Sequence, residues 1–161
     1  PGFNRDFVSE AWDIMPENLY EDLRDEADQQ AEYDKPIEVY ASDIDPEMVE
    51  IAKRNAAEVG LSDIIQFSVK DVNTLSLPDN QAIALVGNPP YGERIGDREE
   101  VNEMYRYIGK LMKQHPYLSA YILTSNKEFE YLANRKATKR RKLFNGYIEC
   151  TYYQYWGERP Q

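Results

Sequence analysis

Hydrophobic and polar positions along the chain follow two different periods, and the change of period marks the elements. Short apolar runs predict buried strands at 37–42, 64–69, 82–87 and 118–124. Apolar residues three or four positions apart predict helices from Pro16 to about Tyr33, from Pro46 to Gly60, from Asp97 to Pro116, and after Ser125. Asp97 and Ser125 are the predicted caps of the last two helices. Asn145-Gly146 between two apolar runs predicts a closing hairpin. This alternation predicts an α/β fold, with a mostly parallel sheet, helices on both faces and a terminal antiparallel hairpin.

Length and composition place the chain among globular domains. Its 161 residues, 42% hydrophobic and 30% charged, predict a single domain over 1–161. The start at Pro1-Gly2 has neither an initiator Met nor a signal-peptide pattern, so we expect an N-terminally truncated piece of a longer protein. With one cysteine, Cys150, the chain has neither an internal disulfide nor a cysteine-built zinc site, and we expect no metal. A lone cysteine also suits the reducing cytoplasm, where we expect the protein to reside.

Charge is distributed unevenly. The net charge of −10 argues against a chain that holds nucleic acid by itself, because such affinity comes from cations that neutralise phosphates. A basic run nevertheless lies within 135–142 and comprises Arg135, Lys136, Lys139, Arg140, Arg141 and Lys142. Two interpretations stay open for this run: a solvated helix end and strand start, or an edge that contacts phosphates.

The sequence Asn88-Pro89-Pro90-Tyr91 follows the apolar run at 82–87. Two consecutive prolines end strand pairing and lack backbone donors, so we expect a stiff loop with free carbonyl acceptors. The Asn88 side-chain oxygen and a prolyl carbonyl together accept both hydrogens of an exocyclic base amine, and Tyr91 stacks on the base. The loop therefore predicts a pocket for a base amine.

Two acids follow the earlier strands. At Asp43-Ile44-Asp45-Pro46, Asp45 suits the N-cap of the next helix and Pro46 its first turn, whereas capping does not account for Asp43. A carboxylate at this strand end is where nucleotide-binding α/β folds receive ribose hydroxyls, although a solvated turn acid is the alternative. Asp71 occupies a similar place after the strand at 64–69.

Asn-Pro-Pro-Tyr resembles the catalytic signature of amino-methyltransferases that act on adenine N6 or guanine N2. Together with Ser42-Asp43-Ile44-Asp45-Pro46 and the Asn145-Gly146 hairpin, it makes nearly the whole chain resemble the THUMP-domain-containing large-subunit ribosomal RNA guanine-N2 methyltransferases, whose relatives are often labelled N6-adenine-specific DNA methylases. The resemblance implies S-adenosylmethionine as cofactor. It implies a cofactor site of Asp43 (ribose), Ile44 (adenine ring), Asp71 (adenine amine) and Asn88, and a catalytic loop of Asn88, Pro89, Pro90 and Tyr91.

The same resemblance implies the class I methyltransferase Rossmann-like fold, with strand order 3-2-1-4-5-7-6. The first strand and its Gly-rich turn have no counterpart in these 161 residues. We expect both upstream of Pro1, together with a substrate-docking domain. The isolated chain should then be inactive and bind the cofactor weakly or not at all, and micromolar binding by calorimetry would contradict this expectation.

The expected function is methyl transfer to the exocyclic N2 of a guanine in large-subunit ribosomal RNA, which is bound mainly by regions outside this chain. Adenine N6 of DNA or RNA is the nearest alternative, because the loop serves either amine. A second alternative is a methyltransferase-like binding module without catalysis. Upstream Gly-rich residues in the parent reading frame would distinguish the enzyme from the module.

Overall fold

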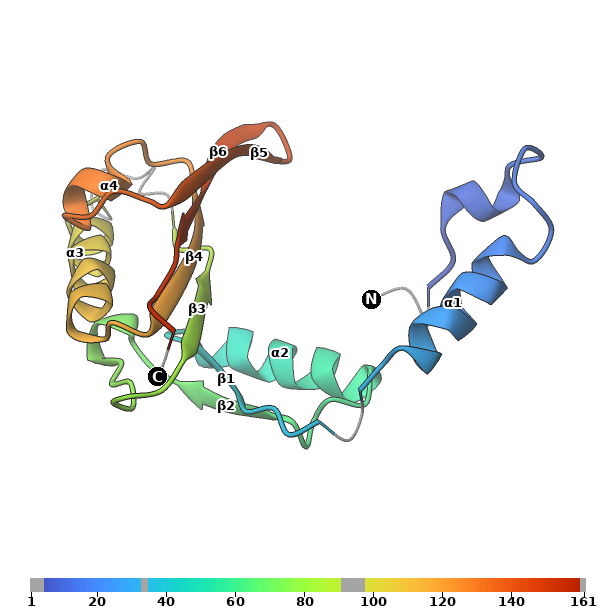
Figure 1. Cartoon of the computed structure of the whole chain (residues 1–161), viewed down its shortest axis with the longest axis horizontal. Helices are drawn as coiled ribbons and strands as arrows, with labels where there is room; N and C mark the ends of the chain where they lie inside the picture. The colour runs from blue at the N-terminus through green and yellow to red at the C-terminus, as the bar shows by residue number, and fades with distance from the viewer. Residues whose placement is uncertain (1–4, 33–34, 91–97, 160–161) are drawn as a thin grey trace. The chain divides into compact units, whose positions relative to one another are not determined.

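Residues 5–32, 35–90 and 98–159 are described by a computed structural model, and the chain divides into two units, Pro1–Val69 and Lys70–Gln161 (Figure 1). Each unit is built around its own parallel strand pair. Within the three described ranges, no helix is long and apolar enough to cross a membrane.

Unit 1 holds one parallel pair of strands and the helix that connects them. Its elements in order are η1 (Val8–Ala11), α1 (Leu19–Gln29), β1 (Val39–Asp43), α2 (Pro46–Glu58) and β2 (Ile65–Val69). The register runs from Val39 opposite Ile65 to Asp43 opposite Val69. The predicted start of α2 is confirmed, because the Asp45 side chain accepts a hydrogen bond of 2.8 Å from the Glu47 N–H and Pro46 opens the helix.

Helix α1 is shorter than predicted. The pattern indicated a helix from Pro16 to about Tyr33, but Asn18 takes a left-handed backbone with φ of 66° and the helix ends at Gln29. No residue of α1 is buried, so its ends lack the tertiary packing that stabilises most helices in proteins.

Unit 2 is a four-stranded sheet with helices on one face (Figure 1). Its elements are η2 (Val72–Thr74), β3 (Ile83–Gly87), α3 (Arg98–Gln114), β4 (Leu118–Thr124), α4 (Phe129–Leu132), β5 (Lys139–Asn145) and β6 (Ile148–Tyr155). The spatial order is β3-β4-β6-β5, with β3 parallel to β4 and β6 antiparallel to both of its neighbours. This arrangement confirms the predicted α/β fold of the class I methyltransferase type, whose strands 4-5-7-6 have the same order. The described helices of unit 2 cover one face of its sheet, whereas helices on both faces were predicted.

The core of unit 2 lies between the sheet and helices α3 and α4. The predicted apolar face of α3 is confirmed, and Tyr105 and Met112 on it are at most 1% exposed. The Phe129 ring meets Tyr105 edge-on, with centroids 4.9 Å apart, and lies 5.1 Å from Tyr153 of β6. Gly109 permits close packing of α3, because a Cβ there would lie 2.1 Å from the Ala133 carbonyl oxygen.

Two local predictions in unit 2 need correction. The hairpin exists, but its two loop residues are Gly146 and Tyr147, since Asn145 ends β5 and pairs with Ile148. Gly146 has φ of +60°, which suits the first central position of a type II′ turn. In the turn before α4, the capping side chain is that of Asn126 and not the predicted Ser125, because Asn126 accepts a hydrogen bond of 2.8 Å from the Glu128 N–H. The predicted cap Asp97 lies outside the described residues.

β1 in unit 1 and β3 in unit 2 are edge strands, each with a single partner in the described part of the chain. β1 pairs with β2, and β3 pairs with β4. In the predicted strand order 3-2-1-4, β1 is strand 2 and β3 is strand 4. The predicted strand 1 comes between them in this order and would need a free edge on each. The predicted first strand and the single domain over 1–161 stay predictions.

Candidate functional site

The predicted catalytic loop leaves the carboxyl end of β3. Gly87, the last residue of β3, pairs with Ile122 of β4, so the core sheet fixes where the loop begins. Asn88 and Pro90 are exposed and Pro89 is half-buried. The predicted stacking residue Tyr91 and the following residues to Asp97 lie outside the described residues.

A buried tyrosine holds this loop. The Tyr105 hydroxyl of α3 donates a hydrogen bond of 3.1 Å to the Pro90 carbonyl oxygen and lies 2.8 Å from the Thr124 hydroxyl at the end of β4. The prediction that the prolyl carbonyls are free acceptors is therefore wrong for Pro90. No hydrogen bond to the Pro89 carbonyl occurs within residues 5–32, 35–90 and 98–159.

The direction of each hydrogen bond follows from the acceptors. The Pro90 carbonyl only accepts, so the Tyr105 proton points towards it and the Thr124 hydroxyl must donate to Tyr105. The Asn126 N–H in turn donates to the Thr124 Oγ1 at 3.1 Å. Three bonds in one direction thus run from the turn after β4 to the catalytic loop, in a site where Tyr105 and Thr124 are both 0% exposed.

The apolar periodicity between Asp97 and Pro116 predicts a core position for Tyr105 and no role at the loop. Its helical spacing was that of any packed aromatic residue. One feature of the sequence does point to a polar contact of Tyr105. Its hydroxyl belongs to the apolar face of α3, and a buried tyrosine hydroxyl usually needs a polar partner. Thr124, the one polar residue among the inward positions of β4, gave the matching signal.

Asp43 makes a local hydrogen bond that sequence reasoning missed. Its Oδ1 accepts from the Asp45 N–H at 2.9 Å, so the carboxylate shapes the turn between β1 and α2. Only one of its oxygens is used in this bond. The neighbouring Ile44 is 68% exposed and presents an apolar side chain at the same turn.

Asp71, like Asp43, uses one carboxylate oxygen for a local hydrogen bond. Its Oδ1 accepts from the Asn73 N–H at 2.8 Å and caps η2, while its carbonyl oxygen accepts from the Thr74 hydroxyl and N–H at 2.8 and 2.9 Å. The side chain is half-buried. Both acids therefore hold their own turns through one oxygen and keep a second oxygen for another donor.

The predicted site residues fall into both units. Asp43 and Ile44 belong to unit 1, whereas Asp71 and 88–90 belong to unit 2. Within unit 2, the structure joins Pro90 to the core through Tyr105. That all these residues share one cofactor site stays a prediction.

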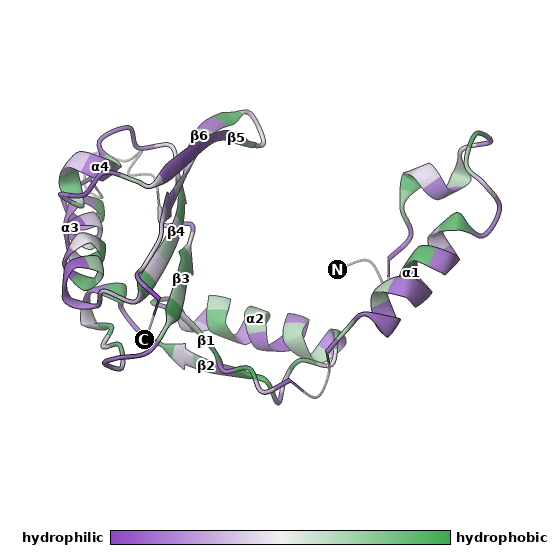
Figure 2. Cartoon of the chain, in the orientation of Figure 1, coloured by the Kyte–Doolittle hydropathy of each residue, from purple (hydrophilic) through white to green (hydrophobic). Residues whose placement is uncertain are grey.

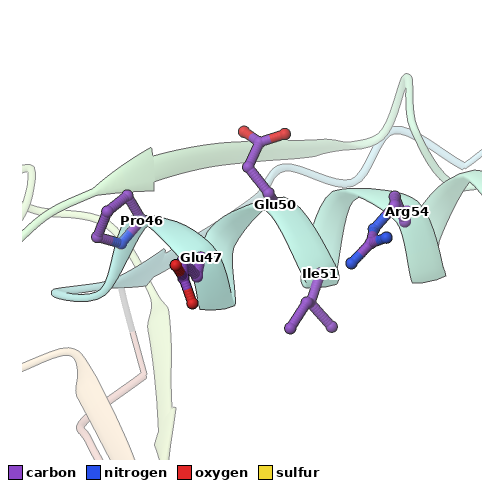
Figure 3. Close-up of a pocket in the computed structure, with 5 residues that line it drawn as sticks. All are labelled: Pro46, Glu47, Glu50, Ile51 and Arg54. Atoms are coloured by element: carbon purple, nitrogen blue, oxygen red, sulfur yellow. The ribbon is translucent and has the colours of Figure 1, made fainter.

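A shallow hollow on unit 1 lies along α2 and is lined by Pro46, Glu47, Glu50, Ile51 and Arg54 (Figure 3). All five residues come from one helix, and neither Asp43 nor Ile44 lines the hollow. No group of three or more His, Cys, Asp or Glu side chains that could hold a metal ion occurs in the ranges that the structure describes.

Comparison with solved structures supports the same architecture. The chain superposes on the crystal structure of SMU.472, "a putative methyltransferase complexed with SAH", with a TM-score of 0.81 and 40% identity, covering 99% of this chain and 42% of that one. A "predicted N6-adenine-specific DNA methylase from Listeria monocytogenes" gives a TM-score of 0.79 and 46% identity over 98% of this chain and 40% of that one.

Comparison of sequences gives the family. The chain is 50% identical to the "Putative RNA methyltransferase YpsC" of Bacillus subtilis, over 100% of this chain and 42% of that protein. It is 35% identical to the "Ribosomal RNA large subunit methyltransferase K/L" of Shewanella frigidimarina, over 94% of this chain and 22% of that protein. The chain thus spans less than half the length of these relatives. The RMKL-like methyltransferase domain matches residues 1–154, and the chain belongs to this family.

Proposed function

We propose that the protein containing this chain transfers a methyl group from S-adenosylmethionine to the exocyclic N2 of a guanine in large-subunit ribosomal RNA. The observation that carries the proposal is the loop at the end of β3. The Pro90 carbonyl there accepts a hydrogen bond from the Tyr105 hydroxyl, whereas the Pro89 carbonyl accepts none from the described residues. The names of the K/L enzymes and YpsC support RNA as the substrate. The crystal structure of SMU.472 in complex with SAH supports the cofactor.

The loop would act by accepting hydrogen bonds from the base. An aryl amine is a weak nucleophile because its lone pair is shared with the ring. Hydrogen bonds from the amine to the Asn88 oxygen and the Pro89 carbonyl favour a pyramidal nitrogen whose lone pair faces the methyl group. The nitrogen would form its bond to the methyl carbon as the carbon–sulfur bond of the sulfonium breaks and the electron pair stays on sulfur. It would afterwards release one proton to water, so no strong base is needed before attack.

Positioning supplies most of the acceleration in this scheme, as it does when reactants are held in line. Tyr91 would hold the base by stacking, which contributes about 1–3 kcal/mol per base in single-strand binding proteins. When bound, S-adenosylmethionine supplies the methyl group on an electron-poor sulfonium. The base must be out of its stack for the amine to reach this loop.

Three side chains fit the adenosine part of the cofactor. The second carboxylate oxygen of Asp43 would accept a ribose hydroxyl, while its first oxygen holds the turn. The exposed side chain of Ile44 would pack on the adenine ring. The second oxygen of Asp71 would accept a hydrogen bond from the adenine amine, and Asn88 would also contact the cofactor.

Adenine N6 is the second candidate substrate. The similar Listeria protein, at 46% identity, is named as an adenine-specific DNA methylase. An adenine amine offers the same two hydrogens to Asn88 and Pro89. A binding module without catalysis is less well supported, because Asp43, Asp71 and Asn88 are all present at strand ends.

Mass spectrometry of nucleosides from ribosomal RNA tests the proposal. RNA from cells that lack the protein should lose N2-methylguanosine at a defined position, and the wild-type gene should restore it. A gene with Asn88→Ala should not restore it, although the variant should still bind S-adenosylmethionine. Loss of N6-methyladenosine would favour the second candidate, and full restoration by Asn88→Ala would rule out the mechanism.

A further inference from the structure

The β5–β6 hairpin carries a concentration of positive charge within an acidic chain. Residues 135–155, which comprise the hairpin and the segment leading into it, contain six of the 19 basic residues and one of the 29 acidic ones, Glu149. The other 140 residues hold 13 basic and 28 acidic residues, a net charge of −15. Every side chain of β5 is exposed, and β5 forms the edge of its sheet.

Part of this charge is already paired within the protein. Arg140 lies 3.2 Å from Glu130, and Lys142 lies 2.6 Å from Glu149. Arg135 donates to the Met112 carbonyl. Lys136, Lys139 and Arg141 are exposed, and none of them forms an ion pair in the part of the chain that the structure describes.

Strand register places two of these unpaired cations on one face beside aromatic side chains. Lys139 and Arg141 are two positions apart on β5, so they point to the same face. They lie opposite Gln154 and Tyr152 of β6. The Tyr152 ring stacks on Tyr121 of β4, with centroids 6.3 Å apart.

The tip of the hairpin is apolar and aromatic. Tyr147, in the turn, is fully exposed, and Phe144 is 63% exposed. In Figure 2 the ribbon of the hairpin changes from hydrophilic to hydrophobic colouring near the turn. Charged side chains on an edge strand discourage pairing with other sheets, but this role does not account for exposed aromatic rings at the tip.

The hairpin projects from the end of the sheet where the catalytic loop begins. Thr124, the last residue of β4, pairs with Thr151, and the hairpin continues beyond it by three residue pairs, from Leu143 and Cys150 to Asn145 and Ile148. At strand spacing this is roughly 10 Å past the end of β4. Pro90, through Tyr105, is tied to Thr124 at that same end.

We propose that the β5–β6 hairpin binds single-stranded RNA next to the nucleotide that enters the catalytic loop. Lys139 and Arg141 contact phosphates, and Tyr147 stacks on an unpaired base. Cations with interleaved aromatic rings are the combination that single-stranded nucleic acid requires. Charge complementarity selects a polyanion as the occupant, since the rest of the chain repels one. The inference rests on the proposed function for RNA as the substrate.

The test measures binding of the intact protein to a fluorescein-labelled, unstructured single-stranded RNA at several KCl concentrations, without cofactor. Lys139→Gln/Arg141→Gln should lower the slope of log affinity against log salt by about 0.7 per lost contact, or about 1.4 in total. Tyr147→Ala should weaken binding about five- to hundredfold at constant slope. The control Lys110→Gln/Lys113→Gln removes two exposed charges from α3 and should change neither quantity.

An unchanged salt slope in Lys139→Gln/Arg141→Gln would overturn the proposal, as would an equal loss of affinity in the control. Altered self-association without altered RNA binding would also overturn it, because the hairpin would then be a protein interface. All substituted side chains are exposed, so the variants should fold, and circular dichroism checks that they do. Since the readout is binding and not methylation, the hairpin proposal and the proposed reaction can fail separately.

Discussion

The buried hydroxyl of Tyr105 donates a hydrogen bond of 3.1 Å to the carbonyl oxygen of Pro90. This bond connects the centre of the unit 2 core to the loop that is proposed to receive the base amine. Because Tyr105 is 0% exposed and Phe129 packs edge-on against it, the ring has little freedom to move. Tyr105 therefore acts as a positioning residue for the loop.

Tyr105→Phe should impair methyl transfer more than stability. Loss of the bond to Pro90 allows the loop to shift, and a displacement of about 1 Å can reduce turnover by about 10²-fold. The free energy of unfolding should fall by about 1–3 kcal/mol, because the buried Thr124 hydroxyl also loses its acceptor. We expect lower kcat with unchanged affinity for S-adenosylmethionine, measured by methylation kinetics and calorimetry of the intact protein.

A matched control for this substitution is Tyr107→Phe. Tyr107 lies on the same helix and donates a similar bond of 2.9 Å, but to the Leu75 carbonyl and not to the loop. It should lose about 1 kcal/mol of stability, for one hydrogen bond, and keep its kcat. Equal activities of Tyr105→Phe and Tyr107→Phe would show that the bond to Pro90 does not position the loop.

Asp71 offers a pair of substitutions that separates its two roles. Asp71→Asn keeps an oxygen that can accept from the Asn73 N–H, so its thermal stability should be close to wild type. Asp71→Ala loses this cap and should unfold more easily, by about 1 kcal/mol. Both variants should bind S-adenosylmethionine more weakly, because the acceptor proposed for the adenine amine is replaced. Unchanged cofactor affinity in both would leave Asp71 with a structural role alone.

Gly109→Ala should destabilise unit 2 although alanine favours helices. The new Cβ would lie 2.1 Å from the Ala133 carbonyl oxygen, so α3 and α4 must separate. Overpacking of this kind costs about 1–3 kcal/mol, which exceeds the helix preference of alanine over glycine of about 1 kcal/mol. Urea unfolding of the intact protein measures the difference. The exposed neighbour Lys110→Ala should change stability by less than about 0.5 kcal/mol.

Stability should decrease at alkaline pH because of buried tyrosines. Burial raises the pKa of Tyr155, and a weaker effect of Glu130 acts in the same direction; burial also raises the pKa of Tyr153. A raised pKa in the folded protein favours the neutral phenol. The resulting stabilisation is complete below the unfolded pKa of about 10 and is lost as pH rises above that value.

Urea unfolding between about pH 9 and pH 11 measures this dependence. Stability of Tyr155→Phe should decline less steeply with pH, because the titrating hydroxyl is gone. Its stability at about pH 9 should already be lower than that of wild type, because it loses the hydrogen bond of 3.2 Å to the Arg135 carbonyl. The exposed Tyr147→Phe should decline as steeply as wild type. An identical pH dependence in Tyr155→Phe would contradict the assignment to Tyr155.

The sequence by itself determined the order and type of the elements. Strand β4 occupies the predicted residues 118–124, and β3 begins one residue later than predicted and ends at Gly87, as predicted. Asp45 and Pro46 open α2 as expected. These features depend on local periodicity and on capping hydrogen bonds between near neighbours, both of which can be read along the chain. The Asn-Pro-Pro-Tyr motif marked the candidate loop for the same reason.

Tertiary structure alone decided which polar groups meet. The bond between Tyr105 and Pro90 joins residues 15 positions apart, and no local pattern predicts it. The one-residue shift of the hairpin turn placed Tyr147 at the tip, because the cross-strand register selected Gly146 as the first turn residue. In both cases the deciding energy comes from packing and register between distant segments, which sequence periodicity does not record.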